Sequence, residues 1–175
     1  MIDRSFNNNC TPQYFFDSLT AITVDDLKRI GAKAVALDID NTTAYDSVMK
    51  LIPGVREWVS AVVQAGFPII IISNTYPLRA KLISKKLGGI PYIADAKKPN
   101  PKNILLGAKR LGVNVGDMCL IGDQLFTDVR GANDAGAISV RVRPQRTEYF
   151  LYFRYKILRK QEREYLTLKG YGDKI

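Results

Sequence analysis

The sequence predicts an α/β fold in which helices cover both faces of a parallel sheet, and two observations carry this prediction. Five short apolar runs alternate with helix-like segments over residues 31–142, and such alternation is typical of parallel sheets. The runs are continuously apolar, as strands buried on both faces must be. The helix-like segments are punctuated by proline at the start and glycine at the end, which is the usual asymmetry of helix termini.

Each element is expected from its own local signals. Before residue 31 the chain holds an aromatic cluster at 14–16 and a helix-like segment at 23–30, where Thr23 and Asp26 form a helix N-cap signal. The expected strands are residues 33–37, 67–72, 91–94, 118–121 and 138–142. The expected helices are residues 55–65, 77 to the glycine pair at 88–89, a segment from Pro99 or Pro101 to Leu111, and 125–135.

The composition is that of one globular domain. Of 175 residues, 46% are hydrophobic and 25% are charged, which are ordinary values for a soluble protein, so residues 1–175 are expected to form a single domain. No apolar run approaches the roughly 20 residues of a membrane helix, and the first residues lack the apolar region of a secretory signal. Cys10 and Cys119 have no CxxC or CxxH companion, which favours reduced thiols in a cytoplasmic protein.

The chain contains no histidine, and this absence excludes whole classes of chemistry. Nucleophile activation by a Ser–His–Asp or Cys–His arrangement is excluded, as is a metal site built on imidazole. A metal ion in this protein must therefore be held by oxygen atoms. Carboxylate, carbonyl and water ligands favour Mg²⁺.

Polar side chains follow three of the expected strands directly. They are Asp38 and Asp40 after the first strand, Ser73 and Asn74 after the second, and Asp123 after the fourth. In an open parallel sheet the ligand crevice lies outside the carboxyl ends of the strands. We therefore expect these side chains to converge on one site.

Two carboxylates spaced i, i+2 at a strand end suit phosphoryl transfer through an aspartyl-phosphate. Asp38 is expected to attack phosphorus and carry the phosphoryl group, while Asp40 protonates the leaving oxygen and then activates water. Ser73 and the backbone N–H of Asn74 are expected to hold a phosphate oxygen. Lys98 is expected to neutralise phosphate charge and to keep Asp38 anionic.

A metal ion would reduce the repulsion between an anionic nucleophile and an anionic substrate. The expected Mg²⁺ ligands are Asp38, the backbone carbonyl of Asp40, and Asp123. Asp128 is expected to order these ligands from behind or through water, and Thr42 places a hydroxyl beside them. Alternatively, Asp128 caps or salt-bridges its own helix.

Taken alone, each of these motifs has a plainer interpretation. A pair of aspartates after a strand is often a loop with solvated carboxylates, and Ser73 with Asn74 suits an ordinary turn. Lys98 is preferred as the lysine of the site because a proline follows it, with Lys97 and Lys102 as the alternatives.

Four motifs occur in order, and together they resemble those of the haloacid dehalogenase-like phosphatase superfamily. They are DIDNT at 38–42, Ser73, Lys98 and GDQLFTD at 122–128. The resemblance implies a Rossmann-like three-layer sandwich whose central parallel sheet has the strand order 3-2-1-4-5. It also implies a phosphatase that uses Mg²⁺.

The spacing of these motifs leaves no room for a cap domain, by which many members of that superfamily enclose small metabolites. Thirty residues separate Thr42 from Ser73, and 24 separate Ser73 from Lys98. An uncapped site is open and suits a phosphate on a bulky substrate. The chain is most similar to the capless subfamily IIIA, in the YqeG/Gep4-type branch that includes mitochondrial phosphatidylglycerophosphate phosphatases.

The basic charge is concentrated in a C-terminal extension at about 143–175, beyond the core. Residues 141–175 carry ten of the 26 Lys/Arg residues but only four of the 17 Asp/Glu residues. One interpretation of 149–160 is a helix that packs Phe150, Phe153 and Ile157 on the core. The other is an interfacial helix whose basic side chains face anionic lipid, namely Arg154, Lys156, Arg159 and Lys160. Nucleic-acid binding ranks third, because no recognised RNA or DNA motif is present.

The sequence therefore predicts a capless, Mg²⁺-dependent phosphomonoesterase that acts through phospho-Asp38. Its expected substrate resembles phosphatidylglycerophosphate, presented at an anionic membrane surface. The expected location is the cytoplasm or the inner membrane face, within an organelle if the source is eukaryotic. The alternatives are the same chemistry on a soluble phosphate ester or a nucleic-acid end, and a non-enzymatic protein that binds RNA or a protein partner.

Overall fold

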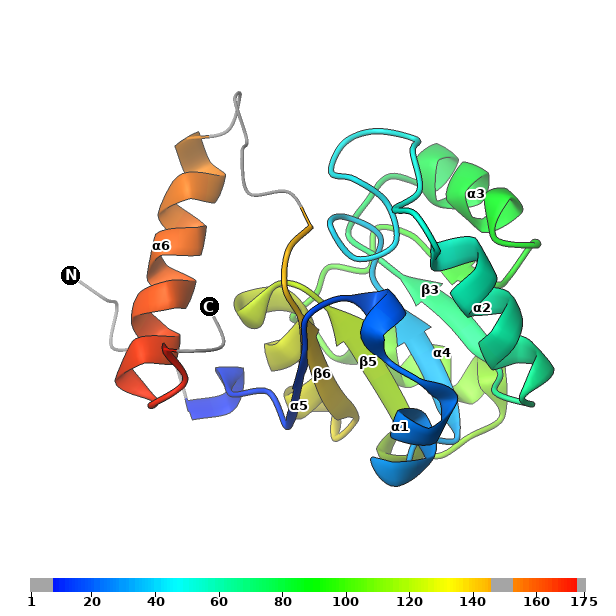
Figure 1. Cartoon of the computed structure of the whole chain (residues 1–175), viewed down its shortest axis with the longest axis horizontal. Helices are drawn as coiled ribbons and strands as arrows, with labels where there is room; N and C mark the ends of the chain where they lie inside the picture. Colours follow the sequence, from blue (N-terminus) through cyan, green and yellow to red (C-terminus); the bar gives the residue numbers. More distant parts are fainter. Residues whose placement is uncertain (1–7, 146–152, 173–175) are drawn as a thin grey trace.

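The structure is a computed structural model that describes residues 8–145 and 153–172. A six-stranded parallel sheet lies between helices on its two faces, which gives three layers (Figure 1). The strands pair in the order β1-β6-β5-β2-β3-β4. Their bounds are β1 Tyr14–Phe16, β2 Ala34–Leu37, β3 Ile69–Ile72, β4 Tyr92–Ile93, β5 Met118–Gly122 and β6 Ile138–Val142.

Different helices cover the two faces of the sheet. Side chains of β2 alternate between the faces, so that Val35 joins the core under α1, α2 and α3, while Ala36 joins the core under α4 and α5. The helix bounds are α1 Val24–Arg29, α2 Val55–Gln64, α3 Pro77–Lys86, α4 Lys102–Leu111, α5 Arg130–Ala135 and α6 Phe153–Leu168.

Five strands of the sheet are those expected from the sequence, and among themselves they keep the order 3-2-1-4-5. The sheet differs from the expectation by a sixth strand, β1, which the aromatic cluster at 14–16 forms parallel to β6. A three-residue strand is too short to give a periodic signal in the sequence. Its partner lies at the far end of the core, so local patterns could not predict the pairing.

The helix expected over 125–135 is in fact two pieces. Leu125–Val129 forms a π-helical turn, and α5 begins only at Arg130. The wider turn coincides with the Asp128 side chain folding back onto the start of the segment, where it accepts a hydrogen bond from the backbone N–H of Gln124 at 3.0 Å. Single-turn π segments are frequent at functional sites.

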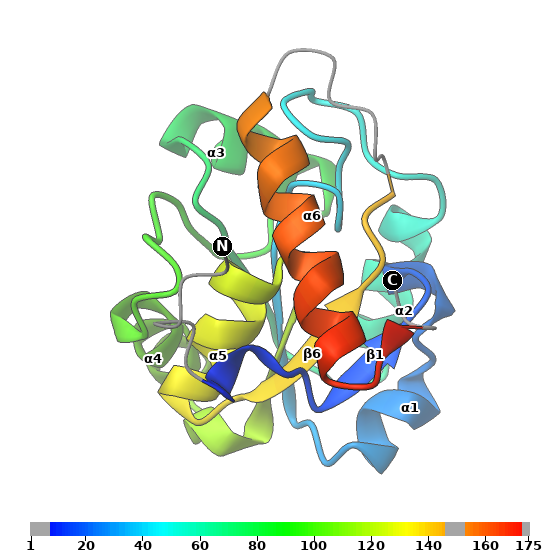
Figure 2. The same cartoon turned by 90° about the vertical axis from the view of Figure 1, so that its left-hand side faces the viewer.

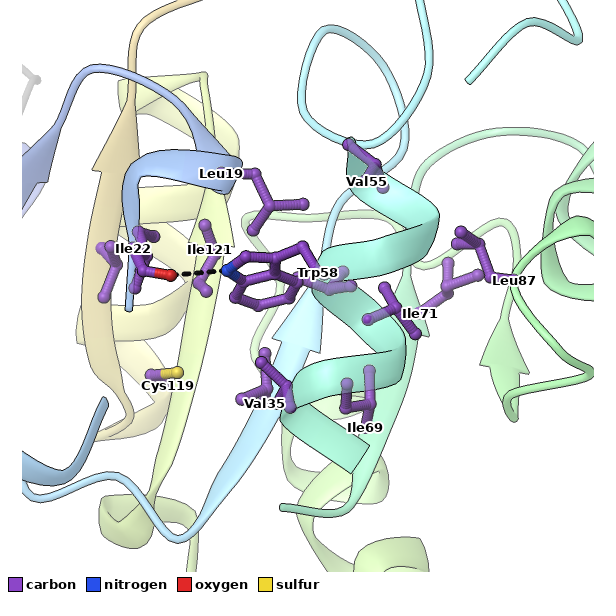
Figure 3. Packing of buried hydrophobic residues seen from close by; sticks show 14 of the residues in the cluster. Leu19, Ile22, Val35, Val55, Trp58, Ile69, Ile71, Leu87, Cys119 and Ile121 are labelled. Carbon is purple, nitrogen blue, oxygen red and sulfur yellow. Dashed lines mark hydrogen bonds between the residues drawn. The ribbon is translucent and has the colours of Figure 1, made fainter. Parts of the chain in front are cut away.

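Trp58 of α2 fastens the segment before β2 to the core. Figure 3 shows its ring among the side chains of Leu19, Ile121 and Val35. The indole N–H donates to the backbone carbonyl of Ile22 at 2.6 Å (Figure 3). This bond satisfies a polar group that the core would otherwise leave buried without a partner.

The C-terminal helix α6 lies beside the part of the molecule that carries β6 and α5 (Figures 1 and 2). Tyr165 and Leu166 are buried there against Leu125, Phe126 and Val129. The described part of the extension therefore packs on the core, as one of the two interpretations predicted. No helix within 8–145 and 153–172 combines the length and the apolarity needed to cross a bilayer.

Of the three residues expected to make that packing, only Ile157 has a described side chain, and for Ile157 the prediction was wrong. Ile157 is 45% exposed, because it lies on the side of α6 opposite the buried pair. Phe150 and the rest of 149–152 lie outside the described residues, as does the side chain of Phe153.

Gly122, the last residue of β5, packs against Asp128, and a Cβ at Gly122 would overlap the Asp128 carboxyl group. We expect Gly122→Ala to lower the free energy of unfolding by about 1–3 kcal/mol through overpacking, measured by denaturant unfolding. The control is Gly116→Ala, whose Cβ would meet nothing nearer than 3.7 Å. Equal loss in the two variants would contradict this packing argument.

Candidate active site

The polar residues that follow β2, β3 and β5 meet at the carboxyl ends of these strands, as expected for a parallel sheet. A pocket of about 140 Å³ lies there. Its lining residues are Asp38, Asp40, Ser73, Asn74, Thr75, Lys98, Gln124, Thr127 and Asp128. The pocket therefore draws its side chains from four stretches that are far apart in the chain.

Lys98 lies at the centre of the site and is buried. Its Nζ is 2.7 Å from Asp38 Oδ1 and 2.6 Å from Asp128 Oδ1. Burial disfavours the charged ammonium, but the charges of Asp128 and Asp38 outweigh that effect and raise the pKa of Lys98. The two alternatives suggested by the sequence, Lys97 and Lys102, are exposed.

Asn74 holds the backbone of Lys98 with two hydrogen bonds. Its side-chain amide donates to the Lys98 carbonyl at 3.0 Å, and its side-chain oxygen accepts from the Lys98 N–H at 2.8 Å. The side chain of Asn74 is thus committed to the loop that carries the lysine. Ser73 is buried in the pocket wall, and its hydroxyl accepts a bond from the Thr75 N–H at 3.4 Å.

Asp40 pairs with Arg79, a residue of α3 that no sequence pattern singled out. The Arg79 guanidinium lies 2.8 Å from Asp40 Oδ1, and the Ser47 N–H donates to the same oxygen at 3.1 Å. Burial and the nearby charge of Asp38 raise the pKa of Asp40 to about 7, while Arg79 opposes the rise. A carboxyl group in this range exchanges protons readily near neutral pH.

Arg79 also connects α3 to the loop after Asp40. It is 2% exposed, and it donates to the backbone carbonyls of Tyr45 and Val48, both at 3.0 Å, and to the Thr75 hydroxyl at 3.2 Å. A buried arginine with this many acceptors holds the surrounding loop in one geometry.

Two threonines lie next to the paired carboxylates, the expected Thr42 and its neighbour Thr43. Thr43 Oγ1 donates to the Asp38 carbonyl at 3.1 Å, which fastens the loop that follows β2. Thr42 is buried beside it, and its hydroxyl makes no hydrogen bond with any residue that the structure describes. Asn41, between these residues and Asp40, adopts the left-handed conformation with φ of 55°, which asparagine tolerates better than most residues.

Asp123 is fully buried and contacts α6. Arg159 forms a short ion pair with Asp123 Oδ2, and the same guanidinium lies 2.7 Å from Glu162 Oε2. Burial raises the pKa of Asp123 to about 8, although Arg159 opposes the rise. The interfacial interpretation counted Arg159 among the lipid-facing residues, and this was wrong, because Arg159 is only 7% exposed and points into the site.

Three buried carboxylates form a group that fits a cation with oxygen ligands. Asp38, Asp123 and Asp128 each offer an oxygen, and these oxygens lie within 4.8 Å of one another. Lys98 pairs with both Asp38 and Asp128, and Arg159 pairs with both Asp123 and Glu162. Asp123 Oδ1 is buried and accepts no hydrogen bond from the described residues. An unpartnered carboxylate oxygen in such a group is what a bound cation would satisfy.

The chain matches the family model of the haloacid dehalogenase-like hydrolases over residues 13–136. It is 34% identical over 133 residues to the probable phosphatase YqeG of Bacillus subtilis. The aligned region covers 76% of this chain and 77% of that protein. It is 31% identical over 142 residues to the mitochondrial phosphatidylglycerophosphatase GEP4 of Saccharomyces cerevisiae, over 72% of this chain and 76% of that protein.

A third relative is the glyceraldehyde 3-phosphate phosphatase of Methanopyrus kandleri, at 31% identity over 75% of this chain and 59% of that protein. The fold is similar to that of an uncharacterised protein from Listeria monocytogenes, with a TM-score of 0.54, 19% identity, and coverage of 75% of this chain and 99% of that chain. The chain belongs to the haloacid dehalogenase-like hydrolases, as a phosphatase related to YqeG and GEP4.

Proposed function

We propose that the protein is an Mg²⁺-dependent phosphomonoesterase in which Asp38 is the nucleophile. The observation that carries the proposal is the contact of Lys98 with Asp38 Oδ1. The ion pair fixes the Asp38 carboxylate in place, and a carboxylate oxygen is the atom that attacks phosphorus in this chemistry. Asp38 also lines the pocket, so a phosphate group can reach it.

The reaction takes place in two displacements. An oxygen of Asp38 forms a bond to phosphorus as the bond from phosphorus to the substrate oxygen breaks, and Asp40 gives its proton to that leaving oxygen. Asp40 then takes a proton from water, whose oxygen attacks phosphorus and releases Asp38 and inorganic phosphate. A pKa of Asp40 near 7 suits both the acid and the base step.

The remaining site residues bind the phosphate and the metal. Ser73, the backbone N–H of Asn74 and Lys98 would hold the non-bridging phosphate oxygens. Asp38, Asp123 and the backbone carbonyl of Asp40 would hold Mg²⁺, with Asp128 and Thr42 behind them. When bound, Mg²⁺ neutralises charge between the anionic nucleophile and the anionic substrate.

The proposed substrate is a lipid phosphate that resembles phosphatidylglycerophosphate, and the relation to GEP4 supports it. The expected placement on an inner membrane face is part of this proposal. A second support is the exposed side of α3 and of Tyr76 before it, since α3 begins two residues after the pocket residue Thr75. Tyr76 and Leu78 are 53% and 61% exposed, and Leu82 follows one turn later at 38%.

Exposed lysines accompany these apolar side chains, since Lys81 and Lys85 lie on the same side of α3 and the helix contains no acidic residue. Basic and apolar side chains together suit the headgroup region of an anionic bilayer. The lipid-facing surface proposed here is therefore α3 rather than α6.

The second candidate is the same chemistry on a soluble phosphate ester, which the likeness to a glyceraldehyde 3-phosphate phosphatase favours. The chain has no further feature in favour of a nucleic-acid end. The non-enzymatic alternative loses its basis, because the relatives are phosphatases and both Asp38 and Asp40 are present. We further propose that the extension from 143 belongs to the same domain as the core.

The roles of the paired aspartates are tested by varying the leaving group. Asp38→Asn is expected to abolish hydrolysis of every substrate, because an amide is a poor nucleophile. Asp40→Asn is expected to cost about 10²–10⁴-fold in kcat on an alkyl phosphate, but much less on p-nitrophenyl phosphate, whose leaving group needs no proton. Steady-state kinetics measure both, with Asp46→Asn as the control. Near-normal turnover by Asp38→Asn would refute the mechanism.

The metal requirement is tested on stability as well as on turnover. Mg²⁺ at 100 times its Kd is expected to stabilise the native protein by about 2.7 kcal/mol, seen as a higher Tm, and EDTA is expected to stop hydrolysis until Mg²⁺ is added back. Asp123→Asn should lose most of the Mg²⁺-dependent rise in Tm. Activity that resists chelation, or an equal rise in this variant, would contradict the metal assignment.

The membrane surface is tested with two matched charge reversals. We expect the native protein to sediment with anionic vesicles more than with neutral ones, and less as salt rises. Lys81→Glu with Lys85→Glu should release it, while Lys156→Glu with Lys160→Glu on α6 should not. Both variants should keep hydrolysis of p-nitrophenyl phosphate.

If only Lys156→Glu with Lys160→Glu released the protein from the vesicles, the lipid-facing surface would be α6 and not α3. A native protein that ignores anionic vesicles would remove the physical support for a lipid substrate and favour the soluble ester.

A further inference from the structure

The C-terminal helix reaches the proposed metal site through Arg159. The Arg159 guanidinium pairs with Asp123 Oδ2 and also donates to the Asp123 backbone carbonyl at 3.2 Å. Both the side chain and the backbone of Asp123 are thereby held by one group. Arg159 lies beyond residues 13–136, the range that matches the family model.

Glu162 completes this contact from the same side of α6. One of its oxygens lies 2.7 Å from Arg159, and the other accepts a hydrogen bond from the Leu125 N–H at 2.7 Å. Glu162 is 1% exposed. Residues three apart on a helix share a face, so α6 fastens the chain at Asp123 and again at Leu125.

The contact leaves the two oxygens of the Asp123 carboxylate in different situations. Oδ2 is occupied by Arg159, whereas Oδ1 is buried and accepts no hydrogen bond from the described residues. Carboxylates that bind a metal are commonly held by a hydrogen bond on their other oxygen, which orients them for the ion.

We propose that Arg159 is a positioning residue that holds Asp123 by one oxygen and leaves the other available to Mg²⁺, so that α6 is part of the active site. This inference rests on the metal site of the proposed function. Docking of α6 does not by itself require the ion pair, because Tyr165 and Leu166 already bury apolar surface against Phe126. A buried ion pair is often no more stabilising than apolar residues of similar size.

The experiment measures the binding of Mg²⁺ alone by isothermal titration calorimetry, on the full chain. Arg159→Met is expected to weaken the affinity for Mg²⁺ about 10–100-fold, as is usual when the partner of a metal ligand is removed. Arg159→Lys keeps the charge without the planar fork and should recover part of the loss. Arg163→Met is the matched control, since Arg163 is exposed on the same helix, and its affinity should equal that of the native protein.

Turnover gives a second readout. If Arg159 acts by orienting Asp123, the Mg²⁺ concentration needed for half-maximal rate should rise in Arg159→Met, while kcat at saturating Mg²⁺ recovers. Circular dichroism and Tm without metal establish that each variant folds. Should Arg159→Met fail to fold, the comparison of Arg159→Lys with the native protein carries the test.

Each possible result of the affinity measurements either supports or overturns the role proposed for Arg159. Unchanged affinity in folded Arg159→Met would mean that Arg159 only packs the helix, and higher affinity would mean that it competes with the ion. Either result overturns the inference while leaving the phosphatase proposal standing. A native protein that binds no Mg²⁺, or that binds it equally well as Asp123→Asn, would overturn the metal site itself and this inference with it.

Discussion

The contact of one ammonium group with two buried carboxylates is the interaction on which the site depends. Lys98 lies 2.7 Å from Asp38 and 2.6 Å from Asp128, all of them buried. Burial of each charge costs several kcal/mol, which close attraction offsets only where the geometry is held. The surrounding structure holds it, because Asn74 binds the backbone of the lysine and Gly122 leaves room for the second carboxylate. The strand ends bring these groups together, and the ion pairs then hold the carboxylate of Asp38, the proposed nucleophile, in place.

Two further carboxylates form ion pairs with arginines that come from helices rather than from strand ends. Arg79 of α3 pairs with Asp40, and Arg159 of α6 pairs with Asp123. Each arginine opposes the rise in pKa that burial causes in its partner. The proposed acid–base group and the proposed metal ligand are therefore paired with separate cations, so that one can be altered without the other. In this arrangement α3 and α6 each contribute one arginine that pairs with a carboxylate of the proposed site.

The sequence predicted the parallel sheet and the convergence of DIDNT, Ser73, Lys98 and GDQLFTD, because both follow from local patterns. Continuous apolar runs mark the strands, and residues just past parallel strand ends must share one edge. The arginines escaped prediction for a physical reason: Arg79 and Arg159 look like ordinary basic residues of helices rich in lysine and arginine. Only tertiary packing decides which cation of a basic helix is buried. The short strand β1 and the π-helical turn likewise depend on distant partners and not on local pattern.

The central claim is that Asp38 carries the phosphoryl group between two displacements. The most direct measurement is to quench the native protein with acid during turnover, digest it, and find the phosphorylated residue by mass spectrometry. The account predicts one phosphoryl group on Asp38, present with substrate and lost on further incubation as water completes the second displacement. A phosphoryl group found on another residue, or hydrolysis that proceeds with Asp38 unmodified throughout, would contradict the account.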